Sequence, residues 1–374
     1  MKIGIITIHK SEVNYGACLQ CYALWKYISN LGHDCEVIDL LRPSQSGYHY
    51  RLGTLKGLKA FLVFGVKLSF TKMLAILRDK QVRRRINRYR DFNNAIKYSS
   101  TYDSPSKIDK RPPIYDIYIS GSDQIWNPNM AFDNEPYLLS FAPYEKKKIA
   151  YASSFGVNTM PSNELSFYSN LLNEYKYIST RENSGKEIVR NLIRKDIPVV
   201  LDPVFLLSAE EWEKVIDKTY EINYDYVLVY SLHENKSLID KATQIAKHLN
   251  YRIILVNADY NVYKSKNIIQ LRDVGPRQWL NLIKGARAFL TDSFHGTAFS
   301  VILGTPFLTW IDSSSKINDR IYTLLFSLKL EDHIIDLSSS LENNLNSINK
   351  NDSKDLLEKC RQKSINFLVK AIYD

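Results

Sequence analysis

The chain has 374 residues, of which 45% are hydrophobic and 24% charged, and its formal net charge is +10. This composition excludes a disordered or fibrous protein, and the length favours two domains over one core. The positive charge is concentrated, because twelve Lys and Arg residues but one acidic residue, Asp79, lie between Arg51 and Arg90. Such a block points to a local anionic partner rather than to a generally basic protein.

Other features argue against a secreted or membrane-spanning protein. Four cysteines are too few for a disulfide framework in a chain of this length. The apolar run at residues 2–8 is short, lacks a cleavage site and is followed by His9 and Lys10, so we expect a strand rather than a signal peptide. No stretch approaches the ~18 uncharged apolar residues of a spanning helix. The sequence therefore predicts a cytoplasmic protein.

A CxxC pair, Cys18 and Cys21, is the one pattern that suggests a metal or redox site. The pair lies inside a predicted helix, with no second pair and no cluster of histidines nearby. The seven histidines also lack the spacing of metal ligands such as HExxH. Helix packing is therefore the preferred interpretation, and we predict no metal.

Short apolar runs alternate with amphipathic segments, the pattern of an α/β protein with parallel sheets. Strands are predicted at residues 2–8, 35–40, 115–120, 148–152, 177–180, 225–230, 251–257 and 287–290. Helices are predicted at residues 15–30, 164–174, 184–194, 208–217, 235–249, 276–283, 295–303 and 354–373. Residues 51–98 interrupt this alternation and are predicted to form one or two basic helices.

These elements predict two successive α/β domains, each with a parallel sheet, that face a central cleft. The first covers residues 1–205, with a basic helical insertion at 48–100, and the second covers residues 206–340. Asp202-Pro203 suggests the hinge between them, and residues 341–374 are expected to form a helix that packs back on the first domain. Ligands bind at the carboxyl ends of parallel strands, so the loops after the strands are the candidate sites.

The loop after the first strand contains Asn14, Tyr15 and Gly16 at the start of a helix. Backbone N–H groups there could face an anion, although a plain turn with Asn14 as the helix cap explains the pattern equally well. The loop contains neither GxGxxG nor a P-loop motif, so dinucleotide and nucleoside triphosphate binding of the usual kind are not supported.

The loop after strand 115–120 contains Ser122, Asp123, Gln124 and Trp126. Polar side chains beside a Trp could hydrogen-bond a sugar and stack on it. A Gly-Ser-Asp sequence is also common in simple turns that connect secondary-structure elements. The local pattern favours neither interpretation.

Charged residues follow two further strands. Arg181 could bind a phosphate or carboxylate with two hydrogen bonds while Glu182 holds it, or the two could be a surface ion pair. His295 follows Asp292 and Ser293 at a predicted helix start, where anions are favoured and an imidazole can exchange a proton near pH 7. A lone histidine is more often structural, but several polar strand-end loops converge on the same predicted cleft.

The basic segment at residues 51–90 mixes apolar side chains with Lys and Arg, including Arg83, Arg84 and Arg85. This mixture suits an interfacial helix on anionic lipid, at the inner face of the membrane. The alternative is an ordinary helical insertion with a solvated basic face. No nucleic-acid-binding motif accompanies the charge, so no nucleic-acid partner is expected.

Taken together, these motifs resemble the polysaccharide pyruvyl transferase family. The matching stretches are Asn14-Tyr15-Gly16, Gly121–Asn127, Tyr151–Gly156, Ser179 with Arg181-Glu182, Leu201–Val204, Thr291–Thr297 and Gly304–Phe307. Each stretch is short, but their order and spacing over roughly residues 1–325 make the joint match specific.

The resemblance implies a fold similar to GT-B glycosyltransferases, with two Rossmann-like domains whose parallel sheets face a central cleft. It also implies transfer of a pyruvyl group from phosphoenolpyruvate to two hydroxyls of a sugar in a capsule or exopolysaccharide precursor, glycan or lipid-linked, which forms a pyruvate ketal. Phosphoenolpyruvate would be a co-substrate, and no cofactor is expected. The alternatives are a GT-B glycosyltransferase that uses a nucleotide sugar and a carbohydrate-binding protein without catalysis.

The resemblance also assigns roles to residues. His295 matches the family's catalytic histidine and is the candidate acid. Many family members carry an Arg two residues before it, where this chain has Ser293. The donor's anionic groups therefore need another cation. The predicted donor-binding residues are Arg181, Ser293, Gly296, Thr297, Lys316 and Arg320. The predicted acceptor-binding residues are Asn14, Tyr15, Gly16, Ser122, Asp123, Gln124 and Trp126.

Overall fold

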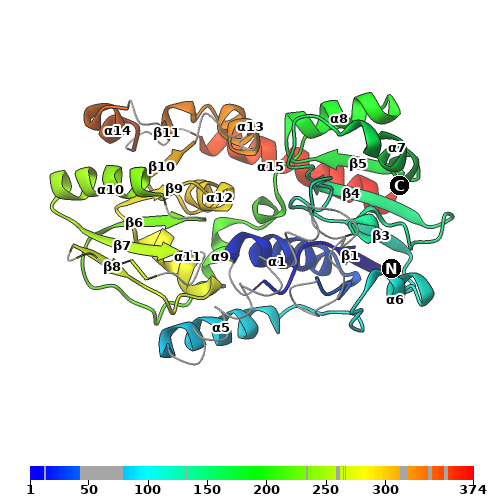
Figure 1. Ribbon diagram of the computed structural model, residues 1–374, viewed down its shortest axis with the longest axis horizontal. Helices are drawn as coiled ribbons and strands as arrows, with labels where there is room; N and C mark the ends of the chain where they lie inside the picture. Colours follow the sequence, from blue (N-terminus) through cyan, green and yellow to red (C-terminus); the bar gives the residue numbers. More distant parts are fainter. Residues whose placement is uncertain are drawn as a thin grey trace.

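The computed structural model contains two α/β domains side by side, joined by a short linker (Figure 1). The described residues are 1–11, 14–42, 79–130, 133–232, 235–257, 262–263, 265, 267–311, 319–335, 339–348 and 353–374. Within them every strand pair of both sheets is parallel. The predicted fold class, two Rossmann-like domains, is confirmed.

The first domain holds a five-stranded sheet in the order β2-β1-β3-β4-β5. Its strands are β1 (Lys2–Ile6), β2 (Asp34–Val37), β3 (Ile117–Ser120), β4 (Lys147–Ser153) and β5 (Tyr177–Thr180). Its helices include α1 (Tyr15–Asn30), α5 (Lys80–Asn93), α6 (Pro105–Lys110), α7 (Leu165–Asn173) and α8 (Asn183–Ile193). The strand order reverses between β1 and β3, the point at which such sheets bind ligands.

The second domain holds a six-stranded sheet in the order β11-β10-β9-β6-β7-β8. Its strands are β6 (Tyr226–Ser231), β7 (Arg252–Asn257), β8 (Ile268–Gln270), β9 (Ala288–Thr291), β10 (Phe307–Trp310) and β11 (Ile334–Ile335). Its helices include α10 (Lys236–Leu249), α11 (Pro276–Gly285), α12 (Phe294–Leu303), α13 (Asp319–Leu328) and α14 (Leu341–Ile348). This is the strand order of the Rossmann fold, with the reversal between β6 and β9.

The linker and the C-terminal helix connect the domains. After α8 the chain passes through a short 3₁₀ turn, η4 (Pro203–Leu206), and α9 (Ala209–Glu213) into the second domain. Helix α15 (Lys354–Tyr373) packs through Leu368 and Ile372 against the core of the five-stranded sheet. It also holds the linker, because Ser364 Oγ accepts a hydrogen bond from Leu201 N at 2.9 Å.

Helix α1 is buried on two sides. Cys21 and Leu24 face the core of its own sheet, whereas Tyr15 and Cys18 belong to a core shared with the second domain. Cys18 and Cys21 form no disulfide and their thiols face different cores, and burial raises the pKa of the Cys21 thiol. The helix therefore needs apolar residues around most of its circumference, which explains the pair by packing.

Tyr15 is the centre of the contact between the domains. Its ring is fully buried and lies parallel to Trp279 of α11, with 4.8 Å between ring centroids. Tyr89 of α5 lies on its other side at 5.2 Å, and the Tyr15 hydroxyl donates to Val274 O at 2.9 Å. The expectation that Tyr15 binds the acceptor is therefore wrong, because its side chain fills the interdomain core.

Helix α5 spans the two domains on one side of the molecule (Figure 1). Arg88 donates to Asp273 Oδ2 at 2.9 Å, and Asp79 pairs with Arg272 of the second domain. Arg85 is buried and donates to Asn257 O at 2.9 Å, so it does not belong to a solvated basic face. The basic segment at 51–90 is thus described only from Asp79 onward, and its association with an anionic membrane stays a prediction. None of the described helices is long and apolar enough to cross a bilayer.

A buried polar cluster joins the ends of β1 and β2. Asp39 accepts hydrogen bonds from Lys10 Nζ and Thr101 Oγ1, both at 2.6 Å, and its Oδ1 lies 2.9 Å from His9 Nε2. Burial by itself would raise the pKa of Asp39, but these three partners outweigh it and hold the pKa well below its usual range. The ionised carboxylate therefore stabilises the folded state.

Replacing Tyr15 by Ala should destabilise the protein by about 3–5 kcal/mol, because it empties a fully buried site between the domains. The melting temperature is the measurement, and Tyr144→Ala, at a ring that is 82% exposed, is the control. Equal melting temperatures for the two variants would contradict the interdomain core.

The contribution of Asp39 should depend on pH in a defined direction. Its folded pKa is depressed, so the stabilisation is complete above the ordinary carboxyl pKa of about 4 and is lost as the pH falls below it. Urea unfolding of the wild type and of Asp39→Asn should differ most near pH 7, and the difference should shrink below pH ~4. A difference that stays constant with pH would refute this assignment.

Candidate functional site

Polar residues from the carboxyl ends of both sheets meet where the domains face each other. Ser122 follows β3, Arg181 follows β5, and His295 follows β9 in the second domain. Asp202, in the linker, contacts all three. The cluster therefore combines both domains and the segment that joins them.

His295 is the second residue of α12, and its side chain is 9% exposed. Its ring lies against Gly16, where an added Cβ would come within 2.0 Å of Nδ1, so position 16 must be a glycine for the ring to stay there. Nε2 is buried, has no hydrogen-bond partner among the described residues and lies 3.6 Å from Asp202 Oδ2. The imidazole is thus held between a backbone and a carboxylate.

Two helix N-termini meet at this imidazole. Asn14 caps α1 by accepting from Ala17 N at 3.1 Å, and Ser293 caps α12 by accepting from Gly296 N at 3.3 Å. Gly16 and His295 occupy the second positions of these helices. Because the N-terminus of a helix carries partial positive charge, this arrangement favours an anion beside His295.

Asp202 is buried and its carboxylate is shared. Oδ2 accepts from Ser122 Oγ at 2.8 Å and from Arg181 Nη1 at 2.7 Å, and Oδ1 accepts from Val204 N at 3.1 Å. Burial alone would raise the pKa of Asp202, but His295, Arg181 and the hydrogen bonds outweigh it and hold the pKa well below its usual range. The group is therefore a permanent negative charge at the site.

Arg181 is surrounded by carboxylates. Beside its contact with Asp202, it has Asp123 at 3.7 Å and Glu182 at 3.8 Å. Burial opposes its charge, but these carboxylates outweigh the burial and raise its pKa. Its guanidinium also lies over the Phe294 ring, 4.6 Å from the centroid. The alternative of a surface ion pair is thus wrong, and Arg181 is engaged within the protein.

A second guanidinium, that of Arg320 in α13, lies on the same ring, 5.8 Å from the Phe294 centroid. Burial and repulsion by Arg181 lower the pKa of Arg320 to about 10. Among the described residues it forms no ion pair within 4 Å, and its Nε has no hydrogen-bond partner. Its terminal nitrogens lie 3.0 and 3.1 Å from the Gln124 side chain, whose oxygen accepts from them when the amide is oriented toward Arg320.

Helix α8 of the first domain contacts α13 of the second domain next to Arg320. Ser184 N donates to Asp319 Oδ2 at 2.9 Å, so a carboxylate of the second domain caps a helix of the first. Asn183 N donates to Thr323 Oγ1 at 3.3 Å. These contacts fix the start of α13, and with it the position of Arg320.

The structure separates the predicted acceptor-binding residues into two groups. Asn14 and Gln124 are half-buried at the interface. Ser122 and Asp123 are buried and bonded to the Asp202–Arg181 pair. Trp126 is fully buried, and its Nε1 donates to Tyr137 O at 3.2 Å, so the expectation that it stacks on a sugar is wrong.

The predicted donor-binding residues of α12 lie beneath His295. Ser293 is the helix cap, and Gly296 packs on Thr291, where an added Cβ would come within 2.6 Å of Oγ1. Thr297 is fully buried, and its hydroxyl lies 2.8 Å from Thr309 Oγ1 and donates to Ser293 O. Lys316 lies outside the described residues.

Two members of the cluster were not predicted as site residues. Asp202 was interpreted only as part of a hinge, and Phe294 only as part of a motif. The signal for Asp202 was present, because a carboxylate before Pro in an apolar Leu-Asp-Pro-Val stretch must find partners when it is buried. Nothing local in the sequence indicates that two guanidiniums lie on the ring of Phe294.

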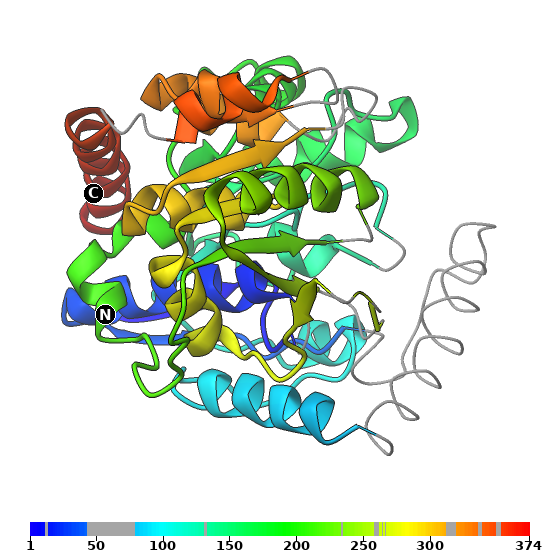
Figure 2. The same cartoon turned by 90° about the vertical axis from the view of Figure 1, so that its left-hand side faces the viewer.

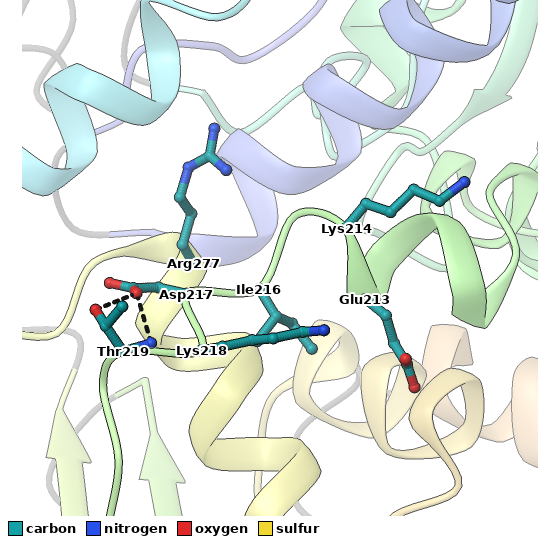
Figure 3. Close-up of a pocket in the computed structure, with 7 residues that line it drawn as sticks. All are labelled: Glu213, Lys214, Ile216, Asp217, Lys218, Thr219 and Arg277. Carbon is teal, nitrogen blue, oxygen red and sulfur yellow. Dashed lines mark hydrogen bonds between the residues drawn. The ribbon is translucent and has the colours of Figure 1, made fainter.

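A separate depression of about 590 Å³ lies on the surface beside α9 and α11 (Figure 3). Its lining residues are Glu213, Lys214, Ile216, Asp217, Lys218, Thr219 and Arg277. In Figure 3 their side chains point in different directions rather than toward one centre. Glu213 is paired with Lys284 and Asp217 with Thr219. The cluster around His295 is therefore the better candidate.

Similar solved structures share the fold at low sequence identity. The UDP-GlcNAc 2-epimerase of Methanocaldococcus jannaschii is 13% identical, covers 99% of this chain and 100% of its own, and has a TM-score of 0.56. MnaA of S. aureus, solved with UDP, is 8% identical over 99% and 96%, with a TM-score of 0.55. The UDP-N-acetylglucosamine 2-epimerase of Rickettsia bellii is 12% identical over 100% and 97%, with a TM-score of 0.51. The chain therefore has the GT-B arrangement of two facing domains.

The sequence comparisons identify the family. No curated protein matches the chain. The family model for polysaccharide pyruvyl transferases matches residues 14–315, a range that includes the α1 cap, the linker carboxylate and the α12 histidine. Because this match covers most of the chain, the protein belongs to the polysaccharide pyruvyl transferase family.

Proposed function

We propose that this protein transfers a pyruvyl group from phosphoenolpyruvate to two hydroxyls of a sugar in a surface-polysaccharide precursor. The products are a cyclic pyruvate ketal and phosphate. Membership of the family supports the transferase class. The observation that carries the proposal further is the imidazole of His295, held at the meeting point of two helix N-termini.

His295 is the proposed acid. It protonates the methylene carbon of phosphoenolpyruvate, which leaves positive charge on the adjacent carbon. A sugar hydroxyl adds to that carbon and loses its proton, which can return to His295. The C–O bond to phosphate then breaks, and phosphate leaves with the bonding electrons. A second hydroxyl adds to the same carbon and gives its proton to the departing phosphate, which closes the ketal. Protons and electrons balance without an oxidant or a further co-reactant.

Arg320 is the proposed cation for the donor. Its charge is not neutralised by an ion pair with a described residue, and it lies on the same Phe294 ring that contacts His295 edge-on at 5.1 Å. Arg181 differs, because three carboxylates lie around it. We therefore assign direct donor binding to Arg320 and to the helix N-termini, and Lys316 stays a prediction.

The half-buried residues indicate the side from which substrates approach. Asn14, Gln124 and Arg320 keep some exposure to solvent, whereas Ser122, Asp123 and Arg181 do not. We propose that the acceptor contacts Asn14 and Gln124, next to the donor at Arg320. The buried residues Ser122, Asp123 and Arg181 then stabilise the site from the protein interior.

The alternative is a GT-B glycosyltransferase that uses a nucleotide sugar, and the fold alone supports it. The reaction products separate the two. Pyruvyl transfer releases phosphate from phosphoenolpyruvate in the presence of a sugar acceptor, whereas glycosyl transfer releases a nucleotide.

His295→Ala should lower the rate of phosphate release from phosphoenolpyruvate by roughly 10²–10⁴-fold, the usual contribution of a general acid. His248→Ala, at an exposed histidine of α10, is the matched control and should keep wild-type activity. A folded His295→Ala variant with full activity would rule out the proposed acid, and nucleotide release by the wild type would favour the alternative.

Arg320→Met should weaken phosphoenolpyruvate binding by about 10- to 100-fold, the loss expected for a hydrogen bond between charged groups. The donor KM and calorimetric binding are the measurements. Arg190→Met, at an exposed arginine of α8, controls for the loss of one positive charge. Unchanged donor binding in Arg320→Met would assign the donor cation elsewhere.

A further inference from the structure

We propose that Asp202 is the positioning residue of this site, and that its carboxylate holds the His295 ring with the proton on Nε2. The effect of Asp202 on catalysis rests on the proposed function, whereas the position of the proton on the His295 ring does not. No atom of Asp202 needs to touch a substrate, because it acts through His295.

The two carboxylate oxygens of Asp202 have different partners, and this difference supports the positioning role. Oδ1 accepts from Val204 N and so caps the turn η4, which is a local structural contact. Oδ2 points the other way and meets Ser122, Arg181 and His295. A carboxylate that served only as a cap would not need an arginine of one domain and a histidine of the other on its second oxygen.

The three partners of Oδ2 are not equivalent. Ser122 and Arg181 donate at 2.8 and 2.7 Å and occupy its lone pairs, whereas His295 Nε2 stays at 3.6 Å. At that distance the contact acts by charge rather than as a full hydrogen bond. An ionised carboxylate favours N–H over a lone pair on the facing nitrogen, so Nε2 carries the proton.

The linker makes the position of this carboxylate well defined. Thr180 pairs with the chain just before the linker, and Ser364 of α15 accepts from Leu201 N. Arg361 of α15 donates to Phe205 O at 3.0 Å and to Leu206 O at 3.2 Å. Asp202 therefore sits on a segment held from both sides, which lets it fix the ring of His295 relative to the first domain.

The consequence concerns the other ring nitrogen. With Nε2 committed to Asp202, Nδ1 is left for proton exchange with the substrate. Nδ1 lies against Gly16, where the absence of a side chain makes room for the ring itself, because an added Cβ would come within 2.0 Å of this nitrogen. Ser122, Arg181 and Asp202 thus orient the acid without taking part in the transfer.

The test combines nitrogen NMR with kinetics. The ¹⁵N signals of His295 are assigned by comparison with His295→Gln, and they report which ring nitrogen is protonated without any substrate. We expect a proton on Nε2 in the wild type and a shift toward the Nδ1–H form in Asp202→Asn. Asp196→Asn, at an exposed aspartate paired with Lys186, should leave the signals unchanged.

In phosphate release from phosphoenolpyruvate, Asp202→Asn should lower kcat about 10- to 100-fold while the donor KM changes by less than about 3-fold. A merely structural role would lower the amount of folded protein but would not move the NMR signals. Unchanged His295 signals in folded Asp202→Asn would overturn the proposal. If that variant does not fold, an unprotonated Nε2 in the wild type would overturn it equally. If the signals shift as expected but the wild type releases no phosphate, the positioning role stands and the proposed function fails.

Discussion

The buried charge of Asp202 is the constraint on which the rest of the site depends. A carboxylate that is 1% exposed must be matched, and this one is matched by an arginine and a hydroxyl of the first domain and by a histidine of the second. Removing one partner would leave the others unpaired in the protein interior. The same contact therefore joins the domains, fixes Arg181 and places His295.

The contact can be maintained because the interface is built like a core. Tyr15 stacks on Trp279, α5 reaches across with Arg85 and Arg88, and α8 is capped from the second domain. This packing presses the start of α1 against His295 so closely that only a glycine fits at position 16. The helix N-terminus and the imidazole are thus placed by the interdomain core rather than by flexible loops.

Much of the fold follows from periodicity in the sequence. The bounds of α1, β5 and α15 agree with their predicted ranges, because their apolar spacing and flanking residues are unambiguous. Strands β8 and β10 were not predicted, since three or four residues carry too little pattern. At the site, His295 was predicted from its motif and its place at a helix start, and the structure places it in the cluster with Asp202. Trp126 and Tyr15 were misassigned, because an aromatic side chain beside polar residues looks the same in sequence whether it faces a sugar or a core.

The proposed function requires phosphoenolpyruvate to bind between the domains with its methylene carbon within reach of His295. A crystal structure of the protein soaked with phosphoenolpyruvate tests this most directly. We expect density for the donor at the N-termini of α1 and α12, an anionic group on Arg320, and the methylene carbon beside the imidazole. Donor bound away from His295, or a nucleotide sugar bound there in its place, would contradict it.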